Sequence, residues 1–150
     1  MDFSFKYLLI AFIFFPICTM VHELGHAFFI KLWGWKVKKI QIGWGDTLIS
    51  IGRLSINKIF FISGATSYER PDKVSKTKWA IVLLGGVIFN GFFIGVLYLV
   101  SLFFKTEYIG IMNFLSCLYI LWCLIPYTDL QGRSSDGKQL LSLLRSTKTS

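Results

Sequence analysis

The chain has 150 residues, 54% of them hydrophobic and 16% charged, which is the length of one domain but too apolar a composition for a typical soluble one. Its net charge of +8 would suit nucleic-acid binding, but the basic residues lie in two blocks, ten of 16 in 31–78 and four in 133–150, separated by apolar stretches. We therefore expect a single membrane-embedded domain over 1–150 and no nucleic-acid partner.

Three apolar stretches are each close to the roughly 20 residues that a helix needs to cross a bilayer. We expect transmembrane helices at about 5–33, 79–104 and 108–126. No small-residue cleavage site follows the first apolar run, so we interpret it as an uncleaved span. Because basic residues concentrate on the cytoplasmic side, the two basic blocks predict a multi-pass protein of the cell membrane, with its N-terminus outside and its C-terminus in the cytoplasm.

The first span carries the motif His22-Glu23-Leu24-Gly25-His26. Residues four apart share one face of a helix, so His22 and His26 can present imidazole nitrogens to one metal ion, with Glu23 beside them as a base for a zinc-bound water. Ionisable groups inside a span are costly unless they are paired or metal-bound, which favours a functional interpretation over a chance match. The motif predicts one Zn²⁺ per chain, and an active site near the cytoplasmic end of this helix.

Between the first two spans, over about 37–64, the pattern changes to short runs of alternating apolar residues, typical of strands. Gly52-Arg53 suits a tight hairpin, and 43–46 is interpreted as a turn. The predicted fold class is an all-α polytopic membrane protein with a small β-hairpin insert on the cytosolic side. The uncharged strands of 48–62 indicate either a packing element at the membrane surface or an edge that pairs with an unwound substrate. A solvated linker is expected at 68–78.

A catalytic zinc site needs a third protein ligand, and the topology places the end of the third span on the same side as the motif. Asp129 and Asp136 both follow that span. Asp136 is favoured because it precedes Gly137, and Asp129 remains the alternative. In the second span, Asn90 is either a polar contact between helices or a side chain that acts on the substrate.

These features together resemble the site-2 protease family of intramembrane metalloproteases, over about residues 15–140. The resemblance is carried by the motif at 22–26, the strand-rich insert, the glycine-rich segment 85–90 and Asp136-Gly137. It implies that Asp136 completes the zinc site and that Asn90 positions substrate or stabilises an oxyanion. Many members have a shorter Pro-x-x-x-Leu-Asp-Gly run before the aspartate, whereas Pro126 and Asp136 are ten residues apart here.

The expected function is hydrolysis of a peptide bond in or next to a substrate's transmembrane segment, with zinc-bound water as nucleophile. The expected partners are a membrane-protein or membrane-bound peptide substrate and the lipid bilayer. The alternative is a non-proteolytic zinc-binding accessory protein for peptide maturation or export.

Overall fold

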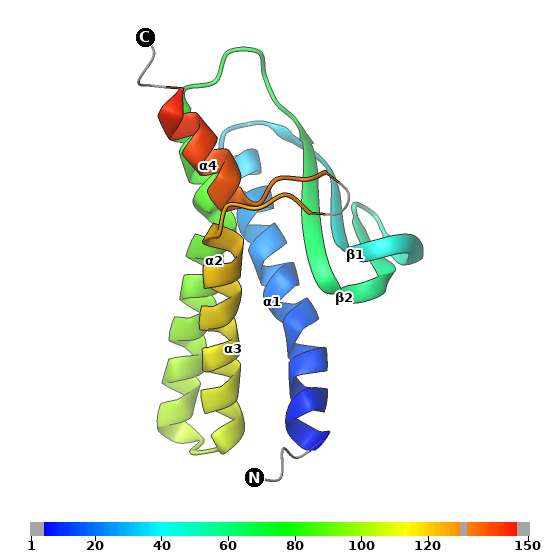
Figure 1. The fold of residues 1–150 in the computed structure, drawn as a ribbon, viewed down its shortest axis with the longest axis vertical. Helices are drawn as coiled ribbons and strands as arrows, with labels where there is room; N and C mark the ends of the chain where they lie inside the picture. Colours follow the sequence, from blue (N-terminus) through cyan, green and yellow to red (C-terminus); the bar gives the residue numbers. More distant parts are fainter. Residues whose placement is uncertain (1–4, 130–131, 147–150) are drawn as a thin grey trace.

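A computed structural model describes residues 5–129 and 132–146. Three long helices lie side by side, and each is long and apolar enough to cross a membrane (Figure 1). They are α1 (Phe5–Leu32), α2 (Lys76–Phe103) and α3 (Glu107–Leu124). The three predicted spans are confirmed as helices. The observed bounds differ most from the predicted ones at the start of α2, which begins at Lys76 rather than at residue 79. Ser75 caps the helix there by accepting a hydrogen bond from the backbone N–H of Lys78.

The chain between α1 and α2 forms two long antiparallel strands, β1 (Lys36–Ile51) and β2 (Leu54–Glu69). The prediction of an all-α class with a small hairpin is therefore only partly right, because the strands make a substantial part of the fold. Both strands bend, since residues 40–42 of β1 pair with 64–66 of β2 on one side and with 54–56 on the other. The small antiparallel sheet is therefore built from two folded-over strands.

Glycines shape the sheet at its turn and at its bend. Gly52, at a φ of 58°, begins the predicted tight turn between the strands. Gly43 and Gly45 also have positive φ, at 86° and 81°, but β1 continues through them and Trp44 pairs with Ile59. The prediction of a turn at 43–46 is wrong, because these glycines bend β1 without ending it.

The strand β2 continues past Gly64, where the sequence predicts the end of the insert, and reaches Glu69 because 64–69 pair with the first part of β1. The sheet lies alongside α1 rather than beyond its end (Figure 1). The ring centroid of Phe12, ten residues before His22, lies 5.5 Å and 4.9 Å from those of Phe60 and Phe61. The insert therefore reaches along α1 toward its N-terminus, well past the His22–His26 motif.

Buried polar side chains form a layer between two apolar clusters. One cluster contains Phe14, Cys18, Tyr119 and Cys123, and the other Ala27, Ile30, Val37 and Val82. The polar layer between them contains Thr19, His22, Glu23, His26 and Asn90. At this level α1 and α2 touch through their backbones, since a Cβ atom on Gly85 would lie 2.8 Å from the carbonyl oxygen of Gly25. The His22–His26 motif thus lies where the backbones of the two helices approach closely.

Candidate metal centre and active-site cleft

The two histidines of α1 point to one side of the helix and are almost completely buried, at 3% exposure for His22 and 8% for His26. Their Nε2 atoms are 3.1 Å apart, as expected for residues one helical turn apart on the same face. The neighbouring α2 makes room for them, because a side chain on Gly86 would overlap the ring of His22. The sequence prediction that these two imidazoles face a common point agrees with this geometry.

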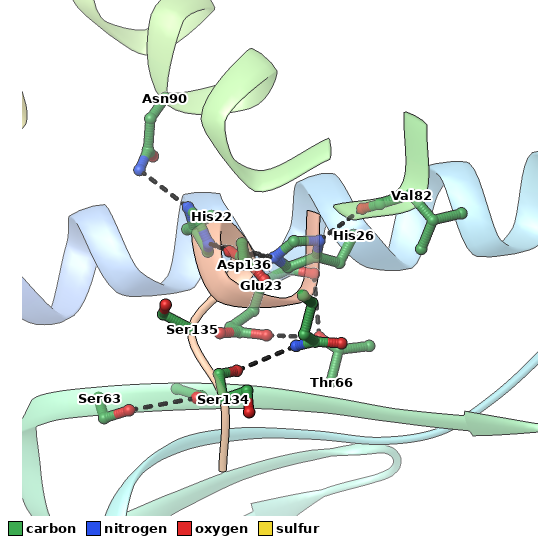
Figure 2. Close-up of polar contacts among 12 residues, drawn as sticks. His22, Glu23, His26, Ser63, Thr66, Val82, Asn90, Ser134, Ser135 and Asp136 are labelled. Carbon is green, nitrogen blue, oxygen red and sulfur yellow. Dashed lines mark hydrogen bonds and ion pairs between the residues drawn. The ribbon is translucent and has the colours of Figure 1, made fainter. Parts of the chain in front are cut away.

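The structure brings Asp136, 114 residues further along the chain, to the same point (Figure 2). Its Oδ2 atom lies 2.8 Å from Nε2 of His22 and 3.3 Å from Nε2 of His26. One ligand atom from each of the three residues falls within 4.8 Å of the others. This group could therefore hold a metal ion.

Asp129, the alternative ligand, does not join this group. Its carboxylate instead accepts hydrogen bonds from the backbone N–H of Arg133, at 2.8 Å, and from Nε of the same residue, at 2.7 Å. These contacts hold the connection between α3 and the short helix α4 (Asp136–Arg145). Asp129 therefore organises the segment that leads to Asp136.

The start of α4 is fixed against the end of α3. Ser135 caps α4 by accepting from the backbone N–H of Lys138, and its hydroxyl donates to the carbonyl of Ile125 at 2.7 Å. Gly137 lies so close to Leu124 that any side chain there would overlap the Leu124 carbonyl. Asp136 is held between these two contacts, at the first position of α4 and directed at α1.

The donor set fits zinc, which prefers imidazole nitrogens and carboxylate oxygens. The Nδ1 atom of His26 lies 2.7 Å from the carbonyl oxygen of Val82, so it carries the proton and leaves the Nε2 lone pair facing Asp136. All three groups are thus oriented as metal ligands.

Glu23 is 5% exposed and its carboxylate faces β2. The hydroxyl of Thr66 donates to Oε2 of Glu23 at 2.7 Å, and a Cβ atom on Gly64 would lie only 2.6 Å from Oε1. Sequence reasoning missed both strand residues, because it ended the insert at about residue 64 and nothing in the small, polar run Ser63–Ser67 marks it as part of the site. The orientation of Glu23 therefore depends on the sheet.

A cleft of about 1100 Å³ opens onto these residues. Its walls are the motif of α1, the residues 63–68 of β2, the end of α3 and the residues 133–136. Tyr119 of α3, also missed from the sequence, lies edge-on to the His22 ring with centroids 5.5 Å apart. Burial raises the pKa of Tyr68, on the sheet wall, to about 12, so this phenol stays neutral. The cleft combines largely apolar walls with the group of ligand atoms and the carboxylate of Glu23.

Asn90 of α2 lies behind His22 and is 1% exposed. Its Nδ2 atom is 3.4 Å from Nδ1 of His22, on the side of the ring away from Asp136 (Figure 2). Asn90 is not among the residues that line the cleft. The Asn90 amide thus contacts His22, a candidate metal ligand.

Comparison with known proteins gives a family match over nearly the whole chain. The model of Peptidase family M50 matches residues 10–148. The chain is also similar to the uncharacterized membrane protein YwmF of Bacillus subtilis (strain 168), with 29% identity over 133 residues, which cover 87% of this chain and 83% of that protein. The family match spans all the residues that form the centre and the cleft.

Proposed function

Because the chain belongs to Peptidase family M50, the site-2 protease family, we propose that it is an intramembrane zinc metalloprotease that hydrolyses a peptide bond in or next to a substrate's transmembrane segment. The family supports a membrane metalloprotease in general. The observation that carries the finer proposal is that His22, His26 and Asp136 converge within 4.8 Å while Glu23 lines the same cleft. Together these are the parts needed for metal-assisted peptide hydrolysis.

In this proposal one zinc ion is held by His22, His26 and Asp136. Zinc bound there would polarise a peptide carbonyl and lower the pKa of a water molecule. Glu23 takes the proton of the attacking water and then delivers it to the leaving amine. Thr66 keeps the carboxylate of Glu23 at one place and in one orientation for both transfers. The backbone carbonyl of Val82 keeps His26 in the tautomer that leaves Nε2 for the metal.

We propose that the substrate is a membrane protein or a membrane-bound peptide whose scissile segment is extended in the cleft. A helix hides its carbonyls in internal hydrogen bonds, so the segment must unwind first. Residues 64–67 of β2 pair with 39–42 of β1 along one edge, and 63–68 line the cleft. The opposite edge of 64–67, which pairs with no strand among the described residues, can hydrogen-bond an unwound chain by strand addition. Residues 48–61, within the stretch where the sequence suggested such an edge, do not line the cleft.

The proposed location is the cell membrane, with the C-terminus and the active site toward the cytoplasm and the N-terminus outside. The start of α1 and the connection between α2 and α3 lie at one end of the bundle, whereas α4 lies at the other (Figure 1). The basic block 31–78 begins at that second end and includes the sheet. The positive-inside rule supports this orientation. Residues 1–4, the predicted external terminus, lie outside the described residues.

The predicted alternative, a non-proteolytic zinc-binding accessory protein, needs the three ligands but not Glu23. A carboxylate that lines the cleft beside the ligand group and is held by Thr66 favours hydrolysis over a purely structural metal site. Removing the Glu23 carboxylate separates the two functions, because only proteolysis needs it.

The test compares the membrane proteome of cells that produce the wild-type chain with that of cells producing Glu23→Gln. We expect a set of peptide fragments, here called Glu23-dependent fragments, to disappear in the variant while the purified variant keeps stoichiometric zinc. Glu69→Gln is the matched control, because Glu69 lies at the end of β2 beside Lys36 and Lys38 and outside the cleft. An unchanged fragment pattern in Glu23→Gln rules out proteolysis by this site.

A further inference from the structure

The amide of Asn90 has one polar atom with a contact and one without. Its nitrogen lies 3.4 Å from Nδ1 of His22, whereas its oxygen, Oδ1, is buried and has no hydrogen-bond partner among the described residues. A buried acceptor without a partner is unfavourable, because it has lost its hydrogen bond to water and gained none in the protein. The position of this amide therefore needs an explanation beyond packing between α1 and α2.

The proton on the His22 ring decides which arrangement is compatible with a metal. If the amide nitrogen donates to Nδ1, the neutral ring carries its proton on Nε2, and that nitrogen cannot ligate. A half-turn of the amide exchanges its nitrogen and oxygen with almost no change in shape. Oδ1 then accepts from Nδ1–H, and the Nε2 lone pair faces Asp136 and His26.

We propose that Asn90 is a positioning residue for the metal centre: its amide oxygen accepts the Nδ1 proton of His22 and so fixes the tautomer in which Nε2 binds metal. This rests on the metal centre of the proposed function, but it does not require that the chain cleave peptides. The half-turn moves the unpartnered position from the amide oxygen to the amide nitrogen. What it gains is that the amide nitrogen no longer conflicts with metal binding at Nε2 of His22.

The second histidine already has the matching arrangement. Nδ1 of His26 lies 2.7 Å from the carbonyl oxygen of Val82, which is eight residues before Asn90 on the same helix. Two acceptors of α2, the Val82 carbonyl and the Asn90 amide oxygen, then accept the Nδ1 protons of the two imidazoles of α1. Outer partners of this kind orient metal-binding histidines and raise their basicity, and losing one typically weakens metal affinity by about 10- to 100-fold.

The other role expected for Asn90, stabilising an oxyanion, requires the amide to reach the substrate. Asn90 does not line the cleft, and the ring of His22 lies between its amide and Asp136 (Figure 2). The two roles predict different measurements. A positioning residue changes zinc affinity, whereas an oxyanion donor changes the cleavage rate and leaves zinc affinity as it was.

The test measures zinc affinity of the purified full chain by competition with a chromophoric chelator. We expect Asn90→Leu, which keeps the volume and removes the acceptor, to bind zinc about 10- to 100-fold more weakly. Asn90→Asp, which has an acceptor and no N–H donor, should restore affinity close to that of the wild type. Asn113→Leu is the matched control, since the Asn113 amide oxygen in α3 is also buried, has no hydrogen-bond partner in the described part of the chain, and lies away from the cleft.

Wild-type affinity in Asn90→Leu, or equal losses in Asn90→Leu and Asn90→Asp, would overturn the proposal. If Asn90→Leu does not fold, the affinity of Asn90→Asp decides alone, because an essential N–H donor predicts loss there. A wild-type chain that binds zinc but yields no Glu23-dependent fragments refutes only the protease function. Equal zinc affinities with fewer fragments in Asn90→Leu refute only the positioning role.

Discussion

Thr66 of β2 donates a hydrogen bond of 2.7 Å from its hydroxyl to Oε2 of Glu23 in α1, between residues 43 positions apart in the chain. The second carboxylate oxygen fits only because Gly64, in the same strand, has no side chain. Glu23 is almost fully buried, so water cannot replace this partner easily. The sheet is therefore part of the catalytic machinery in the proposed function.

Thr66→Val is expected to slow the formation of Glu23-dependent fragments by about 10- to 100-fold, since a hydrogen bond to a charged group contributes about 1.5–3 kcal/mol. Thr66→Ser keeps the hydroxyl and should retain most of the rate. The measurement is the initial rate at which one such fragment appears. Equal rates in the valine and wild-type chains would show that Thr66 does not orient the base.

Gly86→Ala is expected to weaken zinc binding, because its methyl group would overlap the ring of His22 and push Nε2 away from Asp136. The matched control on the same helix is Gly91→Ala, since a Cβ atom at Gly91 meets nothing within 4 Å. Zinc content after dialysis against a weak chelator gives the comparison. We expect less than one zinc per chain in Gly86→Ala and full occupancy in Gly91→Ala.

Gly137→Ala should displace the start of α4, because its methyl group would meet the carbonyl of Leu124, a backbone atom that cannot swing aside. Overpacking of this kind costs about 1–3 kcal/mol, so we expect zinc affinity to fall about 10-fold as Asp136 moves. Gly110→Ala, on a site of α3 with nothing within 4 Å, is the control. An unchanged zinc affinity in Gly137→Ala would contradict the role of this contact.

Replacing Asp136 and replacing Asp129 should have different effects on zinc content and on stability. Asp136→Ala should lose zinc, because it removes a ligand atom 2.8 Å from His22 Nε2. Asp129→Ala should keep stoichiometric zinc but lower the free energy of unfolding by about 1–3 kcal/mol, because it removes two hydrogen bonds to Arg133. Metal analysis and thermal unfolding separate these outcomes, and the reverse zinc contents would assign the third ligand to Asp129.

Local patterns in the sequence were sufficient for the parts of the fold and site that depend on local physics. Long apolar runs predict helices wherever they occur, and His22 and His26 share a face because of helical periodicity alone. The turn at Gly52 was equally local, since it needs a residue that tolerates positive φ. These elements agree with the structure to within a few residues.

The remaining features depend on contacts between distant segments. Ser63–Ser67 lack the alternation of a strand, and only pairing with β1 makes them one, so Thr66 could not be recognised from the sequence. The sequence could rank Asp136 above Asp129 only by its following glycine. The close contact of Gly137 with Leu124 supplies the physical reason for that glycine.

The backbones of α1 and α2 touch at Gly25 and Gly85, so a change of tilt between these helices would turn about a point beside the candidate metal centre. His22 and His26 lie within one helical turn of that contact, whereas Lys6, at the far end of α1, is about 28 Å away along the helix. A change in the tilt between α1 and α2 moves each atom in proportion to its distance from the crossing point. A bilayer of different thickness would therefore displace the far ends of α1 and α2 much more than the ligand atoms. The Lys6–Glu107 ion pair would carry the start of α3 along with the far end of α1.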